Sequence, residues 1–181
     1  MRICILNGSP EAGDFENYLD ALSSQLENAG HVSETYILRD LSIRYCTGCF
    51  SCWVKTPWQC IFHDQSEIIC RAVIHSDLVC MASPISMGFV SALLKKSTDK
   101  LIPLLHPYLN IVQGEMHHRA RYEHYPRWGL ILRPNANSDD EDIDIIQRCY
   151  SRAALNFKSD LAFTRLSTQP VEEVVYEINH L

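Results

Sequence analysis

The sequence of 181 residues has no long apolar run, no excess of basic residues and no repeated segment. No stretch approaches the roughly 18 apolar residues that a membrane-spanning helix needs, so we expect no membrane association. Asp and Glu (22) outnumber Lys and Arg (16), which gives a net charge of −6 and argues against nucleic-acid binding. The balance of 46% hydrophobic and 21% charged residues is typical of a globular protein, and we expect one domain over residues 1–181.

The first ten residues, MRICILNGSP, have too short an apolar run for a secretory signal and lack a small-residue cleavage site. We therefore expect a cytoplasmic protein, in which cysteines are kept reduced. The eight cysteines then favour ligation or redox chemistry over a disulfide framework.

Five short apolar runs predict strands, and segments with helical spacing separate them. The runs lie at residues 2–7, 31–38, 77–82, 127–132 and 160–166. Alternation of strands with helices predicts a parallel sheet covered on both faces and linked by right-handed crossovers. Five strands favour the order 2-1-3-4-5, which is an α/β fold of the flavodoxin-like, three-layer αβα type.

Three helix starts are predicted from capping residues. Asp14 is a plausible N-cap of the first helix. Asp64 with Glu67, and Ser138 with Glu141, have the spacing of a capping box.

Two segments interrupt the alternation. Residues 44–64 form a cysteine-rich loop, and residues 103–126 have no clear period, so we expect an inserted loop there. This insertion holds Glu115, His117, His118 and His124. Di-iron bundles need two Glu-x-x-His motifs and only one is present, so a lid or a dimer contact is favoured over a metal site. The aromatic residues behind that preference are Tyr108, Tyr122, Tyr125 and Trp128.

In a sheet of this order, ligands bind at the carboxyl ends of the strands, where the strand order reverses. Two loops border that point, GSPEAGDF after the first strand and SPISMGFVSA after the third, where Ser83-Pro84 is expected to end the strand. Gly8-Ser9-Pro10 presents backbone N–H groups at a helix start, which suits an anion. Pro84 and Gly88 allow the backbone to approach a flat ligand. Both loops are equally compatible with ordinary turns.

Residues 46–60, CTGCFSCWVKTPWQC, hold four cysteines spaced C-x2-C-x2-C-x7-C. Zinc sites typically use two cysteine pairs separated by a longer loop, whereas compact runs are typical of [4Fe–4S] ligands. Free thiols at a subunit interface are the alternative. Because this segment follows the second strand, we expect it on the same side of the sheet as the two loops. The remaining cysteines lie at apolar positions and are predicted to be core residues: Cys4, Cys70, Cys80 and Cys149.

Three motifs in order, NGSP, the cysteine run and SPIxxGxVSAxLK, resemble the NADPH-dependent FMN reductases, and within them the iron–sulfur flavoproteins of the flavodoxin superfamily. The resemblance is clearest over residues 1–100. It implies that Ser9 and the backbone from Pro10 onward hold the FMN phosphate. It assigns the flavin ring to Ser83, Pro84, Ile85 and Gly88, and a [4Fe–4S] cluster to Cys46, Cys49, Cys52 and Cys60.

The implied function is an FMN-dependent oxidoreductase that transfers electrons from NAD(P)H or a ferredoxin-type donor to a small-molecule or protein acceptor, as a homodimer or homotetramer. No side chain is named as catalytic, because the flavin carries the chemistry. The first loop departs from the family in its acidic residues Glu11, Asp14 and Glu16, and Ser86 replaces an aromatic residue. These departures keep open a flavodoxin-like binding protein, or a thiol redox sensor, that has lost FMN.

Overall fold

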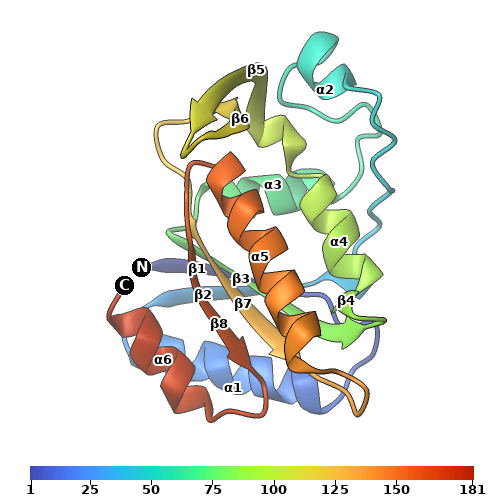
Figure 1. The fold of residues 1–181 in the computed structure, drawn as a ribbon. Coiled ribbons are helices and arrows are strands. Elements are labelled where there is room, and N and C mark those ends of the chain that lie inside the picture. The colour runs from blue at the N-terminus through green and yellow to red at the C-terminus, as the bar shows by residue number, and fades with distance from the viewer.

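The computed structural model describes residues 1–181, and a parallel sheet of five strands lies at its centre (Figure 1). The strands are β1 (Arg2–Asn7), β2 (Val32–Ile37), β3 (Leu78–Ser86), β7 (Arg127–Arg133) and β8 (Leu161–Leu166). They pair in the order β2-β1-β3-β7-β8. Counted along the chain this is the order 2-1-3-4-5, so the predicted flavodoxin-like fold is confirmed.

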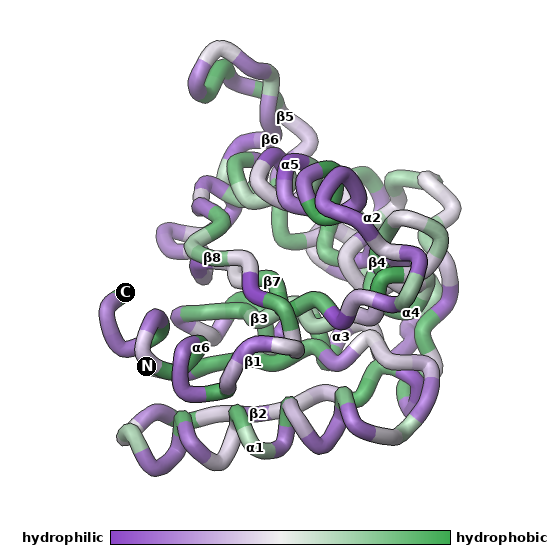
Figure 2. The backbone as a smooth tube through the Cα atoms, turned by 60° about the horizontal axis from the view of Figure 1, so that its bottom comes forward, coloured by the Kyte–Doolittle hydropathy of each residue, from purple (hydrophilic) through white to green (hydrophobic).

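Helices cover both faces of the sheet. The helices α1 (Asp14–Asn28) and α6 (Val171–Asn179) cover one face, and α3 (Ser66–Ile74), α4 (Ala92–Asp99) and α5 (Asp140–Asn156) cover the other. Along β1, Cys4 and Leu6 belong to the core under α3–α5, whereas Ile3 and Ile5 belong to the core under α1 and α6. Successive side chains of a strand point to opposite faces, so a strand with two covered faces needs an unbroken apolar run. Figure 2 shows this run along β3.

The third strand continues past the predicted end at Ser83-Pro84. It runs to Ser86 and turns back as β4 (Phe89–Val90), which pairs with it antiparallel. Met87 (φ 51°) and Gly88 (φ 74°) form the connection. Positive φ at both central residues is characteristic of a type I′ hairpin turn, which the strand signal alone did not indicate.

The cap of α5 lies one residue beyond the predicted pair. Asp139 accepts from the Asp142 backbone N–H at 2.9 Å, and Asp142 accepts from the Asp139 N–H at 3.4 Å, completing a capping box. Ser138 instead accepts a bond from the Asn135 N–H at 3.0 Å. The acidic run offered two pairs with the same spacing, so the prediction of Ser138 and Glu141 was wrong by one residue.

The other two predicted caps also differ. Asp14 is the first helical residue of α1 and Gly13 is its N-cap. The N-cap of α3 is Gln65, without a side-chain cap. The Asp64 carboxylate still accepts from the Ser66 N–H at 3.0 Å, but its second oxygen accepts from the Arg44 N–H at 2.9 Å.

The segment 103–126 is not a plain loop. After the short 3-10 turn η2 (Ile102–Leu104), β5 (Leu105–Val112) and β6 (Glu115–Ala120) form an antiparallel hairpin that projects beyond the sheet (Figure 1). Within the cysteine-rich segment 44–64, one helical turn forms, α2 (Ser51–Val54), and the 3-10 turn η1 (Leu38–Asp40) precedes the segment.

The cysteines outside the motif only partly follow the core prediction. Cys4 and Cys80 are buried and Cys70 is half-buried, but Cys149 is exposed. Helix α5 buries Ile146 and positions four and eight residues later, so Cys149 lies outside its apolar face. None of the helices is long and apolar enough to span a bilayer.

Candidate functional site

The loop after β1 packs tightly against β3 and α4. The Gly8 N–H donates to the Ala82 carbonyl at 2.8 Å. A Cβ at Gly8 would lie 2.8 Å from Leu94 Cβ and 3.0 Å from Ser91 Oγ. Only glycine therefore fits at this position without displacing the start of α4.

Ser9 uses its own donors inside this loop. It is buried, its N–H donates to Asn7 Oδ1 at 2.9 Å, and its hydroxyl donates to the Glu11 carbonyl at 2.7 Å. The backbone N–H groups of Glu11, Ala12 and Gly13 have no intramolecular partner, and they directly precede α1. Unpaired N–H groups at a helix start form a site for an anion.

Two arginines lie near the start of α1, which follows this loop. Arg39 forms an ion pair with Glu16 at 2.7 Å, and both side chains are about one-fifth exposed. The Arg133 guanidinium, at the end of β7, lies 5.6 Å from the ring centre of Phe15. Sequence reasoning missed both cations. Arg133 was detectable, because it directly follows a predicted strand, but Arg39 had no local signal.

Ser83, Pro84 and Ile85 support the loop after β3 from inside. Ser83 is fully buried, and its hydroxyl accepts from the Ser91 N–H and donates to the Pro84 carbonyl, both at 2.8 Å. The Ile85 carbonyl accepts from Asn135 Nδ2 at 2.8 Å. These contacts hold the hairpin rather than leaving polar groups free for a ligand.

The exposed part of this loop is its tip. Ser86 and Met87 are exposed and Gly88 is half-buried. A Cβ at Gly88 would lie 2.7 Å from Asp142 Oδ1, so the start of α5 abuts the tip. Ser9 and the exposed Pro10 lie in the loop at the carboxyl end of β1, the strand that pairs with β3. The two loops thus share one edge of the sheet.

The four cysteines of the motif line one cavity. It is partly open to solvent and has mostly apolar walls that include Phe62, Ile102 and Pro103. The cysteines that line it are Cys46, Cys49, Cys52 and Cys60. No three of them converge on a single ion-sized centre, whereas a zinc site needs each sulfur about 2.3 Å from one ion.

The thiols of the cavity differ in environment. Burial raises the pKa of Cys52, and the neighbouring Cys60, Cys46 and Cys49 raise it further. Cys49 is exposed, and hydrogen bonds from the Ser51 side chain and backbone lower its pKa. Lowered pKa favours the thiolate, the form that ligates metals and reacts.

A buried lysine also reaches the cavity. Lys100 is 3% exposed, and its Nζ lies 3.0 Å from Cys60 Sγ and 3.1 Å from Asp64 Oδ2. Burial alone would lower the pKa of Lys100, but the bonds to Cys60 and Asp64 outweigh burial and raise it. Burial opposes ionisation of Asp64 too, yet hydrogen bonds from Ser66, Arg44 and Lys100 lower its pKa to about 2. Sequence reasoning missed Lys100, which lies 40 residues after Cys60.

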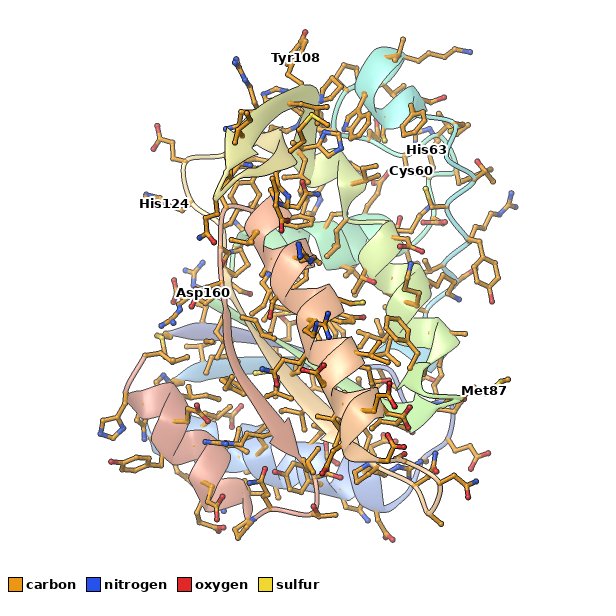
Figure 3. The ribbon with its side chains drawn as sticks, in the orientation of Figure 1. Cys60, His63, Met87, Tyr108, His124 and Asp160 are labelled. Atoms are coloured by element: carbon orange, nitrogen blue, oxygen red, sulfur yellow. The ribbon has the colours of Figure 1, made fainter.

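The cavity is not on the side of the sheet that we expected. It lies against Lys100, Ile102 and Pro103, just after the end of α4, whereas the β3–β4 tip precedes the start of α4. Figure 3 shows Cys60 and Met87 at opposite ends of this helix. The segment after β2 crosses the length of α4, and the Trp53 indole N–H anchors it to the Leu105 carbonyl at 2.9 Å. The expectation of one shared edge was therefore wrong.

The Glu and His residues singled out in segment 103–126 do not gather at one metal-sized centre. Glu115 pairs with Arg152 and with His117 Nε2, the latter at 3.2 Å. The ring of His118 packs on Trp53, with centroids 4.7 Å apart. His124 lies apart from them in the connection to β7 (Figure 3).

A family model described as NADPH-dependent FMN reductase matches residues 1–120. The chain belongs to the NADPH-dependent FMN reductase family. FMN binding is typical of this family. The matched region contains both loops at the sheet edge and all four cysteines of the motif.

Two curated relatives of this chain are iron–sulfur flavoproteins of Archaeoglobus fulgidus. One is 36% identical over 107 residues, which cover 59% of this chain and 48% of the relative. The other is 24% identical over 100 residues, covering 55% and 48% respectively. The chain thus spans about half the length of the curated relatives it matches.

Solved structures of reductases share the fold. An azoreductase from Bacillus anthracis superposes with a TM-score of 0.70 at 9% identity, over 99% of both chains. An NAD(P)H:quinone oxidoreductase from Methanothermobacter marburgensis gives a TM-score of 0.61 at 16% identity, over 99% of this chain and 93% of the other. At these identities the similarity establishes the fold alone.

Proposed function

We propose that this chain is an FMN-dependent oxidoreductase that takes electrons from NAD(P)H and passes them on through an iron–sulfur cluster. One observation carries the proposal beyond the family: the four cysteines of the motif line a single, mostly apolar cavity. The donor set and its apolar surroundings fit a [4Fe–4S] cluster.

The sheet edge fits FMN. The unpaired N–H groups of residues 11–13 would hold the phosphate, with Arg133 as a nearby cation. The tip of residues 86–88 would lie along the flavin ring, held from behind by Ser83, Pro84 and Ile85. Bound there, FMN would supply the electron-transfer chemistry between the nicotinamide and the next acceptor. The chain contributes binding and orientation to this chemistry.

Cys46, Cys49, Cys52 and Cys60 would hold the cluster, which exchanges single electrons. Within one chain, the cavity and the flavin loops are separated by the length of α4, about 13 Å from Ser91 to Lys100. A second copy that presents its flavin loops to this cavity would shorten the path. Large apolar side chains are exposed around the cavity, namely Tyr45, Phe50 and Trp58. We therefore propose a homodimer or homotetramer.

Purification without oxygen tests the proposal. We expect flavin absorbance, together with about four iron atoms and four acid-labile sulfides per chain. Cys60→Ser should lose iron, whereas Cys149→Ser, at an exposed cysteine outside the cavity, should keep it. A colourless protein that stays colourless after FMN is added would contradict the proposal. Flavin without iron would leave an FMN reductase that lacks the cluster.

A thiol redox sensor is the second candidate, favoured by the exposed Cys49 with its lowered pKa. In that case the protein carries no iron, and iodoacetamide should modify Cys49 before the other cysteines. Mass spectrometry of partially alkylated protein measures the order. Equal modification of Cys49 and the exposed Cys149 would contradict this candidate.

A further inference from the structure

Lys100 is the only lysine in the chain that is buried. Its ammonium lies between the thiol of Cys60 and the carboxylate of Asp64, at 3.0 and 3.1 Å. The ring of Phe62 covers it, with the ring centre 5.1 Å from Nζ. A buried positive charge next to one cysteine of the motif changes the electrostatic potential at any group that this cysteine binds.

The reduction potential of an iron–sulfur cluster depends on nearby charge, on hydrogen bonds to its sulfurs and on solvent exposure. One-electron reduction adds one unit of negative charge, while the bond to Cys60 neither forms nor breaks. A neighbouring cation stabilises the reduced state more than the oxidised state, and burial strengthens the effect because water does not screen it. Lys100 supplies both the cation and a hydrogen bond to the Cys60 sulfur.

Asp64 acts in the opposite direction. Its carboxylate is 7% exposed and pairs with Lys100. Two backbone N–H groups also hold it, those of Arg44 and Ser66. This anion partly cancels the charge of Lys100, so the two residues form a buried pair whose parts have opposite effects on an electron acceptor.

We propose that Lys100 is a positioning residue whose ammonium raises the reduction potential of the cluster held at Cys60, and that Asp64 limits this effect. The inference rests on the proposed function, because it requires the cluster. The electron enters from the reduced flavin in the working protein, and from dithionite in the experiment.

The test is a redox titration of the holoprotein, followed by electron paramagnetic resonance. Lys100→Met should lower the midpoint potential of the cluster. A tenfold change of the equilibrium between reduced and oxidised cluster, toward the oxidised form, corresponds to about 59 mV. Asp64→Asn should raise it, and Lys100→Arg should stay near the wild-type value. The double variant should lie between the two single variants. Lys95→Met is the matched control, since Lys95 lies on α4, the helix that directly precedes Lys100, with its side chain 49% exposed.

Shifts of the midpoint potential in opposite directions in the two single variants would distinguish an electrostatic role from a structural one. A structural role alone would shift both potentials in the same direction or leave them unchanged. Circular dichroism and iron content verify that each variant is folded and loaded. If Lys100→Met does not fold, the raised potential of Asp64→Asn still decides the question. Wild-type protein without iron and sulfide would overturn the proposed function and the inference together. A loaded wild type whose potential is unmoved in Lys100→Met or Asp64→Asn would overturn the inference alone.

Discussion

The Ser91 hydroxyl donates a hydrogen bond of 2.6 Å to the carbonyl oxygen of Gly8, which lies 83 residues earlier in the chain. Ser91 Oγ also accepts a bond from the Leu94 N–H at 3.2 Å and so caps α4. The Ser91 N–H donates to Ser83 Oγ at 2.8 Å. One residue therefore fixes the distance between the two loops that we assign to FMN.

Ser91→Ala removes two hydrogen bonds from a buried position. We expect unfolding free energy to fall by about 2 kcal/mol, as for the loss of a cap and a buried partner. FMN affinity should fall as well, because the hydrogen bond that links the two loops is lost. Urea unfolding and flavin titration measure the two effects. Ser24→Ala, which removes an exposed hydroxyl bonded to the Asp20 carbonyl, is the control and should cost less than about 0.5 kcal/mol. Equal losses in the two variants would contradict the prediction.

Gly8→Ala should destabilise the protein by about 1–3 kcal/mol, because the added methyl group meets the Leu94 side chain and the Ala82 carbonyl. Backbone movement that relieves the contact would also displace the loop. Urea unfolding and flavin titration of the variant should both report losses. Wild-type values for both would show that the loop is packed less tightly than in this structure.

Glu11→Arg should tighten FMN binding about three- to tenfold, because it replaces a negative charge with a positive one beside the phosphate. Glu11 is exposed, so the fold should tolerate the change. Glu27→Arg makes the same charge change at the other end of α1 and serves as the control. Quenching of flavin fluorescence gives both affinities. Equal affinities in the two variants would place the phosphate elsewhere.

The stability contributed by Asp64 should depend on pH. Its pKa is lowered to about 2 in the folded protein, whereas an unfolded Asp titrates near about 3.9. A carboxylate whose pKa is lowered by folding stabilises the fold at any pH above its pKa in the unfolded chain. This contribution is lost as the pH falls toward its pKa in the folded protein. In the metal-free protein, Asp64→Asn should therefore cost about 2 kcal/mol at pH 7 and progressively less from pH 4 to pH 2.

Urea unfolding of wild type and Asp64→Asn across this pH range measures the difference. The control is Asp20→Asn, at an exposed carboxylate on α1. A cost of Asp64→Asn that does not change with pH would mean that the loss arises from packing rather than from the charge.

Much of the fold was predictable because its signal is local. The apolar run around Ile3 and Ile5 is buried on both faces, and such a run specifies a central parallel strand without knowledge of its partners. Where the prediction failed, competing local signals were equal or the deciding contact was distant. Asp139 and Ser138 both had a capping partner at the right spacing, and only the packed helix distinguished them.

The sequence by itself determined the strand order, the family and the grouping of four cysteines, because periodicity and motif spacing are carried by neighbouring residues. Only the tertiary structure decided where that grouping lies and what surrounds it. The segment after β2 crosses the length of α4, and Lys100, just after that helix, meets Cys60 and Asp64 near the end of the segment. Contacts between residues far apart in sequence form only when helices and sheet pack, so no local pattern could place the charge beside the thiol.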